Sequence, residues 1–152
     1  MLAMPTLASS QGTGIDLGGF SQDTSLPVQV TSDSLSINQA DGSAVFTGNV
    51  LVIQGDLRLT AAKVQVEYAA TGNDIQRLIA SGGVTMANAT DAAEARDAVY
   101  SLADGMLEMT GDVLLTQGRN TISGGKLRID LKGGTGVMEG RVQTTFTPGP
   151  SP

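Results

Sequence analysis

Residues Phe46–Tyr68, FTGNVLVIQGDLRLTAAKVQVEY, are repeated in residues Met109–Leu131, MTGDVLLTQGRNTISGGKLRIDL, and these two stretches decide the fold. They align without a gap over 23 positions, of which seven are identical, at an offset of 63 residues. A chain that repeats itself at a fixed interval is typical of a fold built from one stacked structural unit.

A finer repeat lies inside this one. The motif Gly-x-Val recurs, and its valines are Val50, Val84, Val113 and Val142. A second motif, a small residue followed by apolar-x-apolar, alternates with it, and its first apolar positions are Leu35, Val64, Ala98 and Leu127. Taken in chain order, these eight positions are 14 or 15 residues apart, except for one longer interval that contains residues 69–74. Each step suits one or two short strands and a turn, which must stack on neighbours to bury an apolar face.

The segments between the turns alternate apolar and polar residues with the period of two that is typical of β-strands. Val64–Tyr68 and Leu127–Leu131 are clear examples, and Ala89–Leu102, although rich in alanine, falls in step with the repeat and is predicted as a strand. One apolar face follows, made by Val28, Val30, Leu35, Ile37, Phe46, Val50, Val52, Leu57, Leu59, Val64, Val66 and Tyr68. If two halves of a folded sheet cover this face completely, it forms a closed core, and if they stay apart, it forms an apolar groove. An apolar stripe of this kind favours the core.

An open stack of strands also leaves unpaired edges at both ends, and such edges are templates for another chain. Head-to-tail association that does not close on itself is therefore expected.

Composition narrows the function. The chain has no His and no Cys, which removes the usual metal ligands, the thiol nucleophile and the commonest general base. Its carboxylates are scattered along the repeat, so we expect no enzyme, no metal and no cofactor. The net charge of −6 lacks the basic clusters that nucleic-acid binding requires.

Three segments are expected. Residues 1–25 are interpreted as the remnant of a secretory signal peptide (1–8) followed by a flexible N-terminus. Residues 26–146 form a single β domain, and residues 147–152, rich in Pro and Gly, form a disordered tail.

The residues that carry the repeat also carry a family resemblance. The run Phe46–Gly55, the segment Pro27–Asp33 before it, Ala61–Val64 after it and the second copy at Thr110–Val113 resemble the periplasmic lipopolysaccharide-transport bridge proteins of the LptA/OstA family. The resemblance covers about residues 26–146.

The resemblance implies a twisted, V-shaped β-jellyroll, a solenoid-like roll of about 14–16 short antiparallel strands with an apolar interior. It implies a periplasmic protein that shelters the acyl chains of lipid A and bridges the inner to the outer membrane by head-to-tail stacking. Its partners would be lipopolysaccharide and the inner-membrane-anchored and outer-membrane translocon components that share the fold.

The resemblance also implies site residues. The lipid-binding interior would be lined by Val28, Val30, Leu35, Ile37, Phe46, Val50, Val52, Leu59, Val64, Val66, Tyr100, Val113, Leu127 and Ile129. The partner edges would lie at Val28, Val30, Val142 and Phe146. Lys63, Lys126 and Arg128 could meet lipid phosphates, or they could simply be solvated strand residues.

Two alternative functions stay open at this point. One is a structural β-solenoid that polymerises into filaments without carrying lipid. The other is the membrane-anchored partner of the same pathway without its anchor.

Overall fold

The chain folds into a single antiparallel β-sheet. The structure is a computed structural model that describes residues 13–16, 23–38, 40, 42–69 and 74–148. These residues form no helix, and so none that is long and apolar enough to cross a membrane. They form the strands β1 (Thr13–Asp16), β2 (Gln29–Thr31), β3 (Ser34–Asn38), β4 (Ser43–Gln54), β5 (Leu57–Tyr68), β6 (Ile75–Ala87), β7 (Asp91–Ser101), β8 (Met106–Gln117), β9 (Asn120–Asp130), β10 (Thr135–Glu139) and β11 (Gln143–Thr145).

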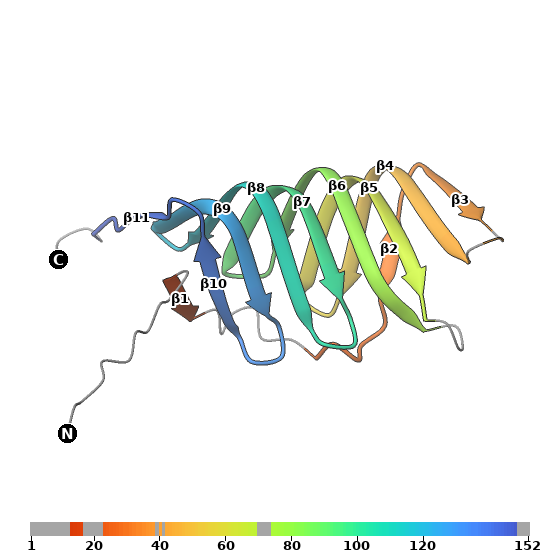
Figure 1. The fold of residues 1–152 in the computed structure, drawn as a ribbon, viewed down its shortest axis with the longest axis horizontal. Helices are drawn as coiled ribbons and strands as arrows, with labels where there is room; N and C mark the ends of the chain where they lie inside the picture. Colours follow the sequence, from red (N-terminus) through yellow and green to blue (C-terminus); the bar gives the residue numbers. More distant parts are fainter. Residues whose placement is uncertain (1–12, 17–22, 39, 41, 70–73, 149–152) are drawn as a thin grey trace, which may run out of the picture.

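The sheet is folded over along its length into two leaves. The strands β4 to β9 are paired in chain order, and each bends near its middle, so that one half lies in each leaf (Figure 1). Leaf A consists of β1, β3, β10 and one half of each long strand; leaf B consists of β2, β11 and the other halves. This architecture confirms the V-shaped β-jellyroll that the family resemblance implies.

The Gly-x-Val motif is the corner of this fold. The registers of β4 and β8 shift immediately before Val50 and Val113, and the two residues before each valine have positive φ angles. In β4 these are Gly48 at 87° and Asn49 at 46°. Because left-handed backbone is strained for most residues, glycine is favoured at the first of the two positions. The Gly-x-Val repeat therefore marks the points at which β4, β6 and β8 turn from one leaf to the other.

The second motif lies against these corners. A Cβ atom on Gly82 would lie 2.6 Å from Cβ of Ala62, and one on Gly111 would lie 2.6 Å from Nε of Arg96. At the last corner the amide of Gly125 donates a 3.0 Å hydrogen bond to the carbonyl of Gly140. The two alternating motifs thus meet in space, the second crossing closely over the glycine of the first.

Several local expectations can be compared with the structure. The alanine-rich segment forms β7, which confirms a strand there. The expected short strands are merged in pairs, because the corners bend the long strands without interrupting the ladder. Residues 69 and 74 join β5 to β6 through a hydrogen bond from the amide of Ala69 to the carbonyl of Asp74, whereas residues 70–73 lie outside the described part.

Within residues 1–25, which were expected to hold a signal remnant and a flexible N-terminus, the structure describes a strand at Thr13–Asp16. These residues form β1 and pair with β10, and Ile15 is 9% exposed. The expected signal remnant at residues 1–8 lies outside the described residues. So do residues 149–152 of the expected tail, whereas the amide of Thr147 donates a hydrogen bond to the side chain of Asn120.

The core fills the space between the leaves. Val64, Leu127 and Ile129 of leaf A and Met86 and Leu115 of leaf B are completely buried and belong to one apolar cluster. With few aromatic residues in the chain, aliphatic side chains and methionines fill the interior. Through most of its length, the apolar face is therefore a packed core.

Candidate functional site

The space between the leaves is the candidate site, because the residues predicted to line the interior meet there. Nine of the fourteen predicted residues are at most 5% exposed: Val50, Val52, Leu59, Val64, Val66, Tyr100, Val113, Leu127 and Ile129. They come from both leaves and contact one another through the common core cluster. The structure thus brings these positions together, whereas any contact with lipid remains a prediction.

The other five predicted residues lie at the N-terminal end of the roll, where the interior opens. Val28, Val30 and Phe46 are only partly buried, while Leu35 is 52% and Ile37 is 66% exposed. We call these five residues the apolar mouth.

The exposed residues of β3 face the interior even so. Leu35 is paired with Phe46 and Ile37 with Ala44, and directly paired residues lie on the same face of a sheet. Ala44 is buried in the core, which identifies that face as the inner one. At this end of the roll, β3 extends beyond the short strand β2 of the other leaf (Figure 1), so its inner face is left uncovered.

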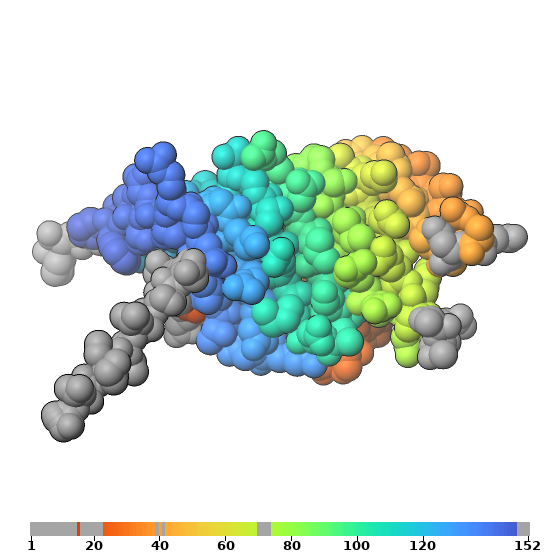
Figure 2. Space-filling view, viewed as in Figure 1, coloured from red at the N-terminus to blue at the C-terminus, as the bar shows by residue number. Residues whose placement is uncertain are grey.

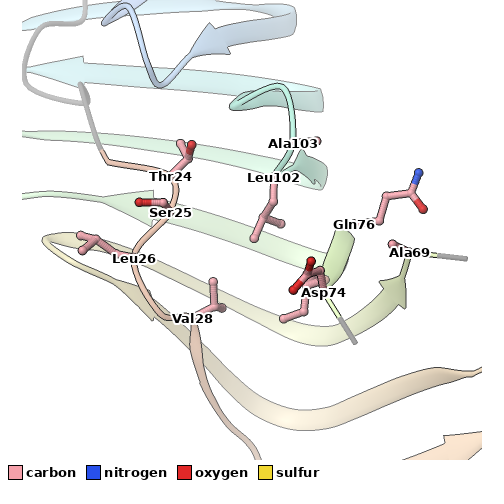
Figure 3. A pocket seen from close by; sticks show the side chains of 10 residues that line it. Thr24, Ser25, Leu26, Val28, Ala69, Asp74, Gln76, Leu102 and Ala103 are labelled. Carbon is pink, nitrogen blue, oxygen red and sulfur yellow. The ribbon is translucent and has the colours of Figure 1, made fainter. Parts of the chain in front are cut away.

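A groove adjoins the mouth along the open side of the V. It has a volume of about 870 Å³ and lies between the segment 23–28, which we call the strap, and the connections after β5 and β7. Val28 from the strap and Leu102 from the β7–β8 connection point into it (Figure 3). Figure 2 shows the strap, in orange-red, along the lower edge of the molecule. A volume of this size falls in the range of small-molecule binding sites.

A buried glutamine holds the strap in place. Gln54, 1% exposed at the end of β4, donates hydrogen bonds from Nε2 to the carbonyls of Thr24 and Leu26, at 3.1 and 3.0 Å. Its Oε1 atom accepts a 2.6 Å hydrogen bond from the hydroxyl of Tyr100. Burial between the leaves raises the pKa of Tyr100 to about 12, so the phenol stays protonated and remains a donor at neutral pH.

Sequence reasoning missed Gln54 and the groove residues Ile75 and Leu102. A signal for the glutamine was available, since Gln54 and Gln117 are identical positions of the long repeat and each ends an apolar run. Gln117 lies at the end of β8 and donates to Oδ2 of Asp91 at 3.4 Å. A polar residue repeated at the end of a strand therefore indicated a structural hydrogen bond.

The basic residues weighed for lipid phosphates lie on the outer face of leaf A. Lys63 and Lys126 are exposed, and each precedes a buried inner residue, Val64 or Leu127, so its side chain points the opposite way. Arg128 forms a 3.2 Å ion pair with Glu139 on the same face. The inner face and the groove are thus lined without these cations.

The carboxylates are dispersed over the surface. Glu67 pairs with Arg77 at 2.6 Å, and Asp33 accepts a 2.9 Å hydrogen bond from Asn49 at the first corner. In the part of the chain that the structure describes, no three His, Cys, Asp or Glu side chains gather in a way that could hold a metal ion.

Comparisons with known proteins agree with this architecture. The family described as LptA/(LptD N-terminal domain) LPS transport protein has a sequence model that matches residues 29–135. The chain belongs to this family. The match begins at β2 and ends at the first residue of β10, so it includes every long strand of the two leaves.

Individual proteins are similar to this chain along most of their length. An uncharacterized protein of Rhizobium meliloti is 30% identical over 152 residues, which cover 93% of this chain and 82% of the relative. The lipopolysaccharide export system protein LptA of Escherichia coli K12 is 30% identical over 139 residues, which cover 87% of this chain and 72% of the relative.

A solved structure shares the fold. LptH of Pseudomonas aeruginosa, described as the LptA-homologous periplasmic component of the lipopolysaccharide transport device, superposes with a TM-score of 0.74. The superposition covers 84% of this chain and 99% of LptH at 19% identity. At that identity the likeness bears on the fold alone, and it supports the β-jellyroll architecture independently of the sequence match.

Proposed function

We propose that this protein binds lipopolysaccharide, shelters the acyl chains of its lipid A part between the two leaves, and passes it along a bridge of stacked copies between the inner and outer membranes. The observation that carries the proposal is the apolar mouth, where the inner face continues outward from the core without a cover. Membership of a lipopolysaccharide transport family supplies the lipid class.

The inner face suits acyl chains for a physical reason. Leu35 and Ile37 hold apolar surface in water, and such surface is stabilised when a hydrocarbon chain covers it. Phe46 and Val30 link these exposed residues to the buried interior, so a bound chain has a continuous apolar path from the mouth inward. The buried residues of the interior set would contact lipid once the leaves separate enough to admit it.

The two ends of the roll suit stacking. Leaf A runs from β3 to β10, which have five residues each, with β1 added beyond β10, and leaf B runs from β2 to β11, which have three residues each. Equal lengths allow both leaves to continue from one copy into the next. On this proposal Val28 and Val30 lie at one contacting edge and Val142 and Phe146 at the other, where Phe146 is 73% exposed.

The proposed location and partners of the protein rest on the same family membership. LptH is described as a periplasmic component, and we propose the periplasm for this chain too. Membrane-side partners with the same fold would add their strands at the two ends of the stack. We further propose that the chain has no enzymatic activity, which is supported by carboxylates that pair on the surface rather than converging in the groove.

Lipid binding can be tested with two exposed apolar residues on opposite faces of the sheet. Ile37 lies on the inner face of the mouth, and Leu114, 36% exposed, lies on the outer face of leaf B. We expect Ile37→Asp to weaken binding of purified lipopolysaccharide about tenfold or more, since a charge placed there is desolvated by the lipid. The matched variant Leu114→Asp should bind as the wild type does, and Phe46→Asp and Val28→Asp should weaken binding like Ile37→Asp.

The measurement is a titration of labelled lipopolysaccharide with folded protein. Absence of saturable binding, or equal effects of Ile37→Asp and Leu114→Asp, would contradict the lipid-carrier proposal. Concentration-dependent growth in light scattering without lipid binding would favour a purely structural filament.

A further inference from the structure

The strand β1 lies where a second copy of the chain would add its first strand. Among the described residues it pairs only with β10, in the register Thr13 with Met138, Ile15 with Gly136 and Asp16 with Thr135. β10 is otherwise the terminal strand of leaf A, paired on its other side with β9 (Figure 1). The edge that ends this leaf is therefore covered by a segment from the opposite end of the sequence.

Strand direction makes this position specific. From β3 to β10, leaf A contains eight strands that alternate in direction, so β10 runs opposite to β3. A second copy placed in the same orientation would therefore bring its β3 antiparallel to β10. β1 is also antiparallel to β10, so it has the direction that an incoming β3 would have.

The cover is small and local. β1 has four residues, against five in β10 and five in β3. β1 buries the apolar side chain of Ile15, whereas the leaf A half of each long strand from β4 to β9 buries at least two residues. A short strand held by little apolar surface is easily exchanged for a longer one, because both offer the same ladder of hydrogen bonds to the edge.

Leaf B differs from leaf A at the same end. β11 pairs with β9, and no further strand follows it among the described residues. An approaching copy therefore meets one open edge and one covered edge, and only the covered edge requires an exchange.

We propose that the edge of β10 is the docking surface for β3 of a second copy of this chain, and that β1 is an intramolecular placeholder which must leave before the copies stack through both leaves. This inference rests on the proposed stacking and adds the step that regulates it. Bound β1 lowers the fraction of molecules competent to stack, and the apparent affinity between copies falls by that fraction.

Two full-length variants change the placeholder in opposite directions. Ile15→Asp introduces a charge at a buried position and should release β1, which should lower the concentration for half-maximal association by about tenfold if about one molecule in ten is uncovered in the wild type. The pair Asp16→Cys and Thr135→Cys joins two directly opposed residues in a chain without other cysteines, and its disulfide should hold β1 in place. The oxidised form should stay monomeric, and reduction should restore wild-type association.

Two control variants separate the placeholder from the stacking itself. Thr60→Asp adds a charge to an exposed position on β5, an inner strand of leaf B, and should leave association unchanged. Ile37→Asp changes the incoming β3 and should abolish association. Sedimentation velocity over a range of concentrations gives the readout, and circular dichroism with thermal melting verifies that each variant is folded.

The outcomes are distinguishable. If the wild type associates, Ile37→Asp does not, and both β1 variants match the wild type, then the placeholder is wrong and stacking stands. If no variant associates, including Ile15→Asp, both the proposed stacking and the placeholder fail. Weaker association of Ile15→Asp than of wild type would overturn the inference by making β1 part of the contact.

Discussion

The hydroxyl of Tyr100 in leaf A donates a 2.6 Å hydrogen bond to Oε1 of Gln54 in leaf B, and Gln54 in turn holds the strap through two backbone carbonyls. Two halves of the roll and the segment along its open side therefore depend on one buried side chain. Buried polar groups that lose their partners destabilise a fold by the full free energy of their desolvation.

We expect Gln54→Ala to lower the free energy of unfolding by about 1–3 kcal/mol, because it leaves the Tyr100 hydroxyl and the strap carbonyls without this partner. Urea denaturation followed by circular dichroism measures the change. Gln117→Ala is a matched control, since Gln117 is the equivalent residue of the repeat but is half-buried and bonds Asp91 at 3.4 Å. We expect a loss below about 1 kcal/mol for it, and equal losses in the two variants would contradict the special role of Gln54.

Tyr100 also gives the stability a dependence on alkaline pH. Burial raises its pKa from 10.0 to about 12, so between these values the unfolded chain releases a proton that the folded chain retains. Stability from this group is fully present below pH 10 and is lost as the pH rises toward 12. Melting temperatures measured across this window should fall less steeply for Tyr100→Phe than for the wild type. Parallel curves would show that Tyr100 titrates equally in both states.

Two neighbouring corner glycines allow the effect of close packing to be separated from that of backbone strain. Gly82 and Gly83 have φ angles of 82° and 89°, so alanine at either position strains the backbone, by about 1–2 kcal/mol. At Gly82 the added Cβ would also lie 2.6 Å from Cβ of Ala62, whereas at Gly83 it would meet nothing within 4 Å. Gly82→Ala should therefore be the more destabilising by a further 1–3 kcal/mol, roughly the effect of overpacking.

The extra loss at Gly82 should be recovered in part by Ala62→Gly, which removes the atom that the new methyl group meets. Chemical denaturation of the single and double variants measures this coupling. A loss for Gly82→Ala no greater than that for Gly83→Ala would show that the corner is not closely packed.

Two isoleucines on the inner face separate the mouth from the core. Ile129 is fully buried, and Ile129→Ala should lower the free energy of unfolding by about 2–5 kcal/mol. Ile37 is 66% exposed, and Ile37→Ala should change it by less than about 0.5 kcal/mol while weakening lipid binding. Parallel denaturation and lipid titrations test both. A large stability loss at Ile37 would mean that the mouth is closed in solution.

The sequence predicted the repeat at which the strands bend, although only the structure identifies the repeat as a line of corners. The glycines at positive φ belong to a motif that recurs along the chain, so Gly48, Gly82, Gly111 and Gly140 could be found by counting. The alternation of apolar residues likewise predicted which side chains face inward. Alternation is visible within a single strand, and the repeat is visible from its spacing along the chain.

The contacts that sequence reasoning missed join distant segments. Nothing near Ile15 indicates that β1 pairs with β10, some 120 residues later, and its four residues carry no clear alternation. The hydrogen bond from Gln54 to the strap likewise crosses 28 to 30 residues. Whether the interior is a core or a groove also depended on how much of each leaf covers the other, which the pattern of one strand does not determine.

The corner repeat has a consequence for the size of such proteins. A hairpin of two long strands adds about 10 Å to the roll, since neighbouring strands lie about 4.7–4.9 Å apart. Such a hairpin also adds one copy of each of the two alternating motifs, and it leaves the direction of the terminal strand unchanged. Gain of a single strand would reverse that direction and mismatch the two ends. A roll of this kind can therefore lengthen or shorten over time only in whole hairpins, and its span is set in discrete increments rather than continuously.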